Sequence, residues 1–168
     1  MTIMLKRNEY PYLPLGRVFK FVQADDPFIS AARQLAYKFR GQLQQTSAAV
    51  IVRSENIIGI GSIGQNYHAE KGCERIKLQL PTGTGYDKCP GCHADNHSEA
   101  NAIRNALSFS NDIADCDLYL WGHWWCCQQC WEKMLTNGIR NVYLLEHAEV
   151  LFNKSHRDNI VGKQFADM

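Results

Sequence analysis

The stretch His97-Ser98-Glu99-Ala100-Asn101-Ala102-Ile103, with Cys127-Gln128-Gln129-Cys130 further along the chain, carries the residues around which the fold is organised. One histidine and two cysteine thiolates are a complete protein ligand set for a catalytic zinc ion, which keeps its fourth position for water. Zinc makes hydroxide from that water near neutral pH. The Glu99 carboxylate follows His97 too closely to bind the ion comfortably, but it can reach the zinc-bound water and carry protons. The two stretches therefore predict one catalytic zinc site, with His97, Cys127 and Cys130 as ligands and Glu99 as general acid and base.

Both stretches also stand where helices are expected to begin. The polar pair Asp95-Asn96 precedes the first stretch, and apolar residues then recur at helical spacing up to Leu107. The second stretch is followed by a similar run, which ends at Asn137-Gly138, a helix stop of the left-handed type. A helix N-terminus stabilises thiolates through its dipole and its unpaired N–H groups. We therefore expect two helix starts to share one ion.

The pattern His-x-Glu followed by Cys-x-x-Cys resembles the signature of zinc-dependent cytidine, deoxycytidylate and related deaminases. The continuation Asn101-Ala102-Ile103 is most similar to the deoxycytidylate deaminase branch, and the resemblance extends over residues 48–145. Two positions depart from the family pattern: Ser98 stands where Ala is usual, and Cys126 stands where Pro usually precedes the first cysteine ligand. The resemblance implies a single deaminase domain over residues 1–168 with a cytidine deaminase-like fold, assembled as a homo-oligomer.

The resemblance also implies a reaction, the hydrolytic deamination of a cytosine nucleotide, dCMP or CMP, to dUMP or UMP plus ammonia. In this reaction Glu99 delivers protons to ring N3 and to the leaving ammonia. The N–H of Ser98, with that of Cys127 or its neighbours, holds the pyrimidine carbonyl or the exocyclic nitrogen. Asn66 stands at the family's sugar-contacting loop, and an ordinary turn residue is the alternative interpretation. Rival functions are deamination of another free base or nucleoside (cytidine, guanine or adenine type), editing of a polynucleotide, and a non-catalytic zinc module.

Length and composition limit the class of protein. The 168 residues suit one domain with a single core. With 18 basic and 17 acidic side chains the net charge is +1, so we expect a small-molecule nucleotide or nucleoside as partner and not a nucleic acid. The sequence shows neither a signal-peptide core nor an apolar run of membrane length, and we expect a soluble, cytoplasmic protein without membrane contact. Seven cysteines, an odd number, fit metal ligation better than disulfides.

The order of the expected elements predicts an α/β fold, a three-layer α/β/α sandwich with a mixed sheet. Residues 1–25 are expected to form an irregular arm, and a helix should begin at Asp26-Pro27 and end at Gly41. The remaining predictions are a hairpin of strands 48–52 and 57–60, parallel strands 117–121 and 141–145, and a helix over 158–165.

Several further residues are candidates for substrate contact. Trp124 and Trp125 lie beside the first cysteine ligand, where they either stack on the base or belong to the core. Lys71, Arg75 and Lys77 are candidates for contact with a 5′-phosphate, or else form an ordinary solvated face.

Four more potential metal ligands are not used by the catalytic site. Cys89-Pro90-Gly91-Cys92 resembles a zinc knuckle, and Cys73 with His93 or His68 would complete four ligands for a second, structural zinc. The alternative is a set of reduced surface thiols in a long loop. The cofactor expected from the sequence is thus Zn²⁺, one ion catalytic and a second structural if these residues bind one.

Overall fold

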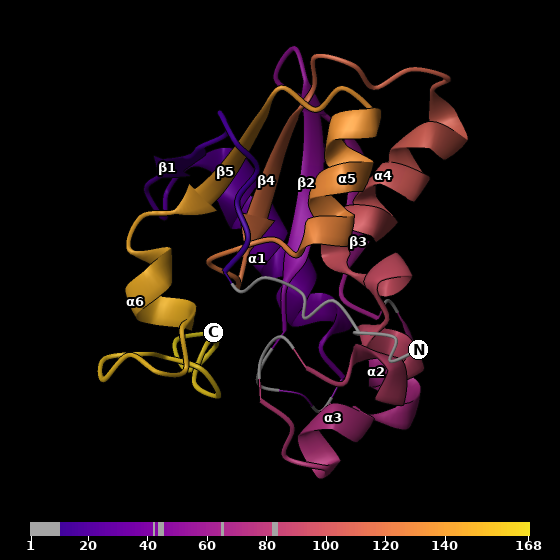
Figure 1. The fold of residues 1–168 in the computed structure, drawn as a ribbon. Helices are drawn as coiled ribbons and strands as arrows, with labels where there is room; N and C mark the ends of the chain where they lie inside the picture. The colour runs from indigo at the N-terminus through magenta and orange to yellow at the C-terminus, as the bar shows by residue number, and fades with distance from the viewer. Residues whose placement is uncertain (1–10, 42, 44–45, 65, 82–83) are drawn as a thin grey trace.

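The computed structural model describes residues 11–41, 43, 46–64, 66–81 and 84–168. Within these ranges the chain builds one five-stranded sheet with strand order β1-β5-β4-β2-β3 (Figure 1). In chain order the elements are β1 (Phe19–Val22), α1 (Pro27–Phe39), β2 (Ala48–Arg53), β3 (Asn56–Ser62), α2 (Asn66–Lys71), α3 (Glu74–Lys77), the 3₁₀ turns η1 (Tyr86–Lys88), η2 (Pro90–Cys92) and η3 (Ala94–Asn96), α4 (Ser98–Phe109), β4 (Asp117–Trp121), α5 (Gln128–Thr136), β5 (Asn141–Leu145) and α6 (Ala148–Phe152).

The sheet is mixed, as predicted. β2 pairs antiparallel with both β3 and β4, whereas β5 pairs parallel with β4 and β1. Ser54 and Glu55 join β2 to β3, and both have positive φ, 48° and 64°. Positive φ at both central residues matches a two-residue hairpin turn whose twist suits the flanking strands.

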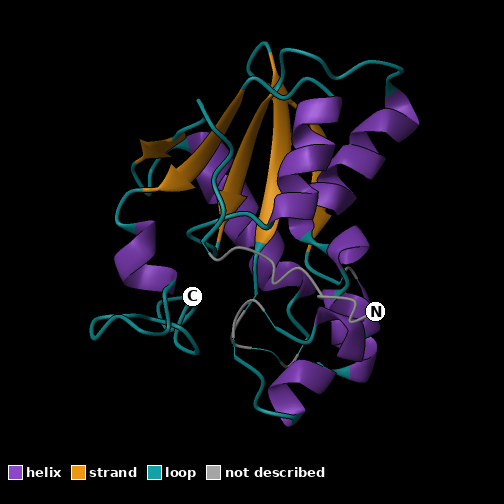
Figure 2. Cartoon of the chain, in the orientation of Figure 1, coloured by secondary structure: helices purple, strands orange, loops and turns teal. Residues whose placement is uncertain are grey.

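Helices cover both faces of this sheet. α1 lies on one face, while α4 and α5 lie side by side on the other (Figures 1 and 2). Residues 48–52 of β2 are all buried, as expected for a central strand covered on both sides. The predicted three-layer α/β/α sandwich is therefore confirmed.

Helix α1 begins where the sequence predicts. The Asp26 carboxylate accepts hydrogen bonds from the N–H groups of Phe28 and Ile29 at 2.9 and 3.0 Å, and Pro27 occupies the first turn. These contacts satisfy two donors that have no acceptor inside the helix. The buried face of α1, with Ile29, Ala32 and Ala36, packs on the sheet.

Two glycines in β3 let α4, the helix that follows His97, approach the sheet closely. A Cβ at Gly61 would lie 2.3 Å from the backbone nitrogen of Ala102, and one at Gly59 would lie 2.6 Å from the Ala106 side chain. Glycine inside a strand commonly marks such a close approach. The position of α4, and so of the residues at its start, depends on these two missing side chains.

We expect Gly61→Ala to lower the free energy of unfolding by about 1–3 kcal/mol, because the added methyl group meets helix backbone that cannot rotate away. Urea denaturation followed by circular dichroism measures this. Ile60→Ala is the matched control, since its side chain is 39% exposed on the same strand and should cost ~1 kcal/mol or less. Equal losses in the two variants would show that the close approach is unimportant.

Two sequence predictions are wrong. Residues 1–25 are not irregular throughout, because Phe19–Val22 form the edge strand β1 with Phe19 opposite Val142; residues 1–10 lie outside the described part. β1 has only four residues and takes its register from β5, which is distant in sequence. Residues 158–165 form turns, and the helix of this segment is α6, further upstream. Gly162 has φ +85°, which interrupts a helix.

Candidate metal centre and active-site cavity

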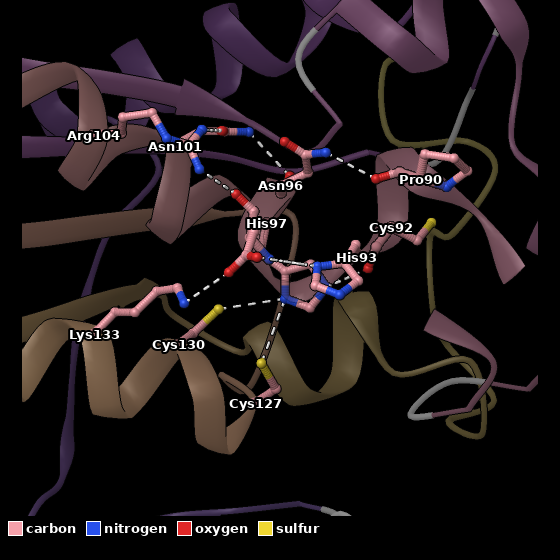
Figure 3. A network of polar contacts seen from close by, with 11 residues as sticks. Pro90, Cys92, His93, Asn96, His97, Asn101, Arg104, Cys127, Cys130 and Lys133 are labelled. Carbon is pink, nitrogen blue, oxygen red and sulfur yellow. Dashed lines mark hydrogen bonds and ion pairs between the residues drawn. The ribbon is translucent and has the colours of Figure 1, made fainter. Parts of the chain in front are cut away.

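The three predicted zinc ligands meet at one buried point. Nδ1 of His97 lies 3.5 Å from Sγ of Cys127 and 3.4 Å from Sγ of Cys130 (Figure 3). Nitrogen and sulfur ligands of one tetrahedral zinc ion should lie about 3.5 Å apart, given Zn–N and Zn–S bonds of roughly 2.0–2.1 and 2.3 Å. All three side chains are buried, and their ligand atoms lie within 4.8 Å of one another. The donor types and their spacing fit zinc.

Two helix starts supply these ligands. His97 is the N-cap of α4, Cys127 is the N-cap of α5, and Cys130 lies in the first turn of α5. A hydrogen bond from Cys130 and the neighbouring His97 lower the pKa of the Cys127 thiol, which favours the thiolate that a metal needs. The arrangement agrees with the two shared helix starts expected from the sequence.

A contact on the side of the His97 ring away from the grouped sulfurs fixes the orientation of the ring. Its Nε2 lies 2.8 Å from the carbonyl oxygen of Cys92, to which it donates a hydrogen bond when the proton is on Nε2. That bond leaves the lone pair of Nδ1 free for a metal, the usual arrangement of a metal-binding histidine. Figure 3 shows Cys92 turning its carbonyl toward His97 and its sulfur away from it.

Asn101 has a structural role beside this ligand. Its side-chain amide donates to the carbonyl of Ser62 at 2.9 Å. The amide also donates to the carbonyl of Asn96 at 3.0 Å, and the side-chain oxygen accepts from Arg104 at 2.6 Å (Figure 3). The side chain is buried, and the two bonds that its amide donates join the end of β3 to the turn before His97. The Lys133–Asp95 ion pair, at 2.9 Å, connects α5 to the same turn.

Glu99 lies at the edge of the site, in the first turn of α4. Its side chain lines the cavity described below yet is only 6% exposed, and burial raises the pKa of its carboxyl. The Cys126 thiol lies close to this carboxylate, and burial and the neighbouring Glu99 raise the pKa of the thiol. The three grouped ligands are His97, Cys127 and Cys130, so the group contains the two cysteines of the Cys-x-x-Cys spacing and not Cys126.

A cavity of about 380 Å³ opens beside the three ligands. His97, Ser98, Glu99 and Cys127 form one part of its wall. The hydroxyl of Ser98 is hydrogen-bonded to that of Ser47 at 2.8 Å, so its side chain is held against the start of β2. This volume suits a small-molecule ligand.

The predicted substrate-contacting residues separate into two groups. Ser98, Trp125 and Arg75 line the cavity. Trp124 packs against the main core. It is not among the described residues that line the cavity. Asn66 begins α2, but its side chain lies outside the described part, so its sugar contact stays a prediction. Lys71 and Lys77 are exposed away from this cavity, and Lys77 is paired with Glu74 at 2.6 Å.

The cavity wall also contains polar residues that were not candidates from the sequence, among them His123, Lys154 and Gln164. Desolvation by burial, with His97 contributing, lowers the pKa of His123 to about 4, so its imidazole is neutral near pH 7. Lys154 and Gln164 come from the segment after α6, which folds back so that the Gln164 amide oxygen accepts from the Thr46 N–H at 3.1 Å. His123 is in the aromatic run that precedes Cys127, which could have suggested it. Lys154 has no such sequence signal.

A second group of potential metal ligands lies in the same region. His68, Cys73, Cys89 and Cys92 are all buried, with their ligand atoms within 4.8 Å of one another. His93, the fourth ligand first considered, is not brought to these cysteines. Its side chain is 57% exposed, and its Nδ1 accepts from the Asp95 N–H at 3.3 Å. His68, the other candidate, stands in its place.

Comparisons with known proteins give one matching family model and several similar solved structures. A family model described as "Cytidine and deoxycytidylate deaminase zinc-binding region" matches residues 22–146. No curated protein matches the chain. A solved guanine deaminase from Bacillus subtilis is 22% identical, with 78% of this chain and 72% of that chain covered and a TM-score of 0.47. A dCMP deaminase from cyanophage S-TIM5 is 17% identical over 71% of this chain and 83% of that one, with a TM-score of 0.42.

A third solved structure, a diaminohydroxyphosphoribosylaminopyrimidine deaminase/5-amino-6-(5-phosphoribosylamino)uracil reductase from Thermotoga maritima, is 20% identical. It has a TM-score of 0.43, and the match covers 70% of this chain but 28% of that one. Because the family model spans most of the sequence, the chain belongs to the cytidine and deoxycytidylate deaminase family, whose zinc-binding region it carries. Membership of this family indicates a hydrolase that acts on a C–N bond. In the described part of the chain no helix has the length and apolar character that crossing a membrane requires.

Proposed function

We propose that this chain hydrolytically deaminates a free cytosine nucleotide, dCMP or CMP, releasing ammonia and the uracil nucleotide. The observation that carries the proposal is a single cavity holding both the metal-side group of His97, Cys127 and Glu99 and two cationic side chains, Arg75 and Lys154. The metal-side group is suited to the hydrolysis of an amino group on a cytosine ring. The two cations are suited to binding the phosphate of the same nucleotide.

Zinc bound by His97, Cys127 and Cys130 would supply the Lewis acidity that makes hydroxide from water near neutral pH. Glu99 accepts a proton from the attacking water and delivers protons to ring N3 and to the departing amino group, so that ammonia leaves and a carbonyl remains. The raised pKa of the Glu99 carboxyl suits a group that takes up and releases protons in turn.

The cavity wall also offers contacts for the base. The N–H of Ser98 belongs to the first turn of α4 and has no acceptor within the helix, so it can donate to the pyrimidine carbonyl. Trp125 also lines this cavity, and its side chain is 3% exposed and belongs to the main core. The position of Ser98 supports the role assigned to it from the sequence, and Trp125 meets both of its alternatives.

The two cations differ in how firmly they are held. Arg75 donates to the carbonyls of Thr84 and Pro81 at 2.7 and 3.0 Å and stacks over Tyr86 at 4.7 Å. Lys154 makes no ion pair or hydrogen bond through its ammonium group with the described residues, and burial and the nearby Arg75 lower its pKa. A phosphate would relieve that repulsion.

Lys154→Ala should therefore raise KM for dCMP or CMP about tenfold, since a hydrogen bond to a charged group contributes about 1.5–3 kcal/mol and this one is partly solvated. Deamination of the matching nucleoside should change little. Lys71→Ala is the matched control, because that lysine is exposed and outside the cavity. Parallel losses on nucleotide and nucleoside in Lys154→Ala would contradict a phosphate contact.

Ammonia release from a panel of free bases, nucleosides, monophosphates and single-stranded oligonucleotides tests the function itself. The proposal expects the highest kcat/KM for a cytosine monophosphate. Preference for guanine, adenine or a nucleoside would move the assignment to that substrate class, and preference for an oligonucleotide would indicate a polynucleotide editor. If the zinc-loaded protein released no ammonia from any of them, the chain would be a non-catalytic zinc module. The homo-oligomeric state and cytoplasmic location belong to the same proposal and are supported by the family resemblance and by seven unpaired cysteines.

A further inference from the structure

We infer that His68, Cys73, Cys89 and Cys92 bind a second zinc ion, which is structural and which holds the catalytic histidine in place. This inference concerns metal content and the wall of the cavity. It does not depend on which substrate the protein deaminates, and its tests need no substrate.

The four donors surround one point. Nε2 of His68 lies 3.4 Å from Sγ of Cys89 and 3.5 Å from Sγ of Cys92, and the sulfurs of Cys73 and Cys92 are 3.4 Å apart. A tetrahedral zinc ion would place such nitrogen–sulfur pairs about 3.5 Å apart and sulfur pairs about 3.8 Å apart. The sulfur pair needs to open by only a few tenths of an ångström. Three thiolates and one imidazole close the coordination sphere, as in structural zinc sites.

Two glycines leave the space that the His68 imidazole occupies beside the three cysteines. A Cβ at Gly91 would lie 2.6 Å from Nε2 of His68, and a Cβ at Gly64 would lie 2.6 Å from Nδ1. The ring thus fits between two glycines, one of them inside the Cys89–Cys92 knuckle. Nδ1 of His68 is buried and has no hydrogen-bond partner among the described residues. No hydrogen bond from those residues to Nδ1 therefore fixes the orientation of the ring. Its orientation is explained by the sulfurs that Nε2 faces.

The surrounding segment needs such a tie. Between α2 and α4 the described chain contains one four-residue helix and three short 3₁₀ turns. Its apolar cluster is small, consisting of the three cysteines with Leu43, Tyr67 and Tyr86 packed against them. Long loops with little secondary structure usually have another means of support, and metal binding supplies folding free energy to such segments.

Zinc explains this cluster better than a disulfide does. A disulfide between Cys73 and Cys92 would need its sulfurs at about 2.05 Å, well inside the observed separation. It would also leave Cys89 and His68 buried beside it with no function. All three sulfurs face the same imidazole nitrogen or one another, and one cation satisfies all four groups.

Cys92 connects this cluster to the catalytic centre. Its sulfur faces His68 and Cys73, while its carbonyl oxygen lies 2.8 Å from Nε2 of the catalytic ligand His97. Figure 3 shows the two groups pointing in different directions from one residue. A metal that fixes the sulfur of Cys92 also fixes the carbonyl that orients His97, so the second ion acts as a positioning element for the first.

Metal analysis of the purified full-length chain should find two zinc ions per chain. The zinc content of Cys89→Ser should fall to one ion per chain. When this variant is loaded with cobalt, its spectrum should lose the thiolate-to-cobalt absorption of a three-thiolate site and keep that of the catalytic site. His93→Ala, the exposed neighbour, should stay at two. One zinc per chain in correctly folded, unmodified protein, or a mass lower by two hydrogens that marks a disulfide, would overturn the site.

The effect of the second ion on the catalytic zinc site is measured separately. In Cys89→Ser the catalytic site should bind its zinc about tenfold more weakly than in the parent, as measured by competition with a chelator. Loss of a contact that orients a metal ligand typically lowers metal affinity about 10- to 100-fold, and tenfold is the lower end of that range. Unchanged affinity would show that the second ion does not position His97. If Cys89→Ser does not fold, stepwise chelation of the parent protein decides the same points. Two separable releases, with the catalytic ion more easily lost after the structural one, support the inference, and a single release overturns it.

Discussion

Replacing Glu99 with glutamine should lower turnover by about 10²–10⁴-fold, the contribution usual for a positioned general acid and base. The amide keeps the size of the carboxyl, but it cannot take a proton from water. Because Glu99 is not among the grouped metal ligands, zinc content and melting temperature should stay close to those of the parent. Steady-state ammonia release and metal analysis of the same preparation measure both quantities.

The control for Glu99→Gln is Glu132→Gln, a carboxyl on the exposed face of α5 that is hydrogen-bonded to Gln128. Its turnover should match that of the parent. Loss of zinc in Glu99→Gln would mean that the residue serves the metal, and full turnover would remove its proton-carrying role.

Cys127→Ser should lose the catalytic zinc ion, so that the chain binds one zinc fewer than its parent and turnover disappears with it. The hydroxyl of serine is a poor ligand for zinc, and His97 with Cys130 alone is an incomplete set. Cys126→Ser tests the adjacent thiol, which lies close to Glu99 and outside the ligand group. We expect this variant to keep its zinc, because the three grouped ligands are unchanged.

Metal analysis of the two serine variants side by side separates the alternatives in the Cys126-Cys127 pair. Zinc lost from Cys126→Ser and kept in Cys127→Ser would reverse the ligand assignment. Refolding each variant with excess zinc distinguishes weak binding from loss of the fold, since weak binding is restored at high metal concentration.

Local signals explain which parts of the structure could be predicted. Asp26-Pro27 carries its own cap chemistry, and the hairpin of β2 and β3 is marked by two β-rich runs with a short polar turn between them. The spacing of Cys127 and Cys130 within one helix start brings both sulfurs to one ion, whatever lies elsewhere. Each of these features depends on residues within a few positions of one another.

The features that could not be predicted depend on contacts between distant residues. His68, and not His93, faces the cysteines because α2 is folded against the knuckle, with Gly91 making space for the ring. β1 is a strand because β5 offers an edge to it. Lys154 reaches the cavity only because the segment after α6 turns back toward β2. No local pattern marks any of these three.

The cavity wall is built from two parts of the chain, one inside and one outside the region matched by the family model. The region matched by the family model ends at residue 146, whereas Phe152, Lys154, Val161 and Gln164 all line the cavity. The metal ligands and Glu99 lie in the first part, and the lysine proposed to recognise phosphate lies in the second. Substitution of cavity residues in the second part, such as Lys154, would therefore change this side of the wall and leave the metal ligands and Glu99 in place. Under the proposed function, relatives that share the zinc ligands but differ in this tail would be expected to have diverged in substrate while conserving chemistry.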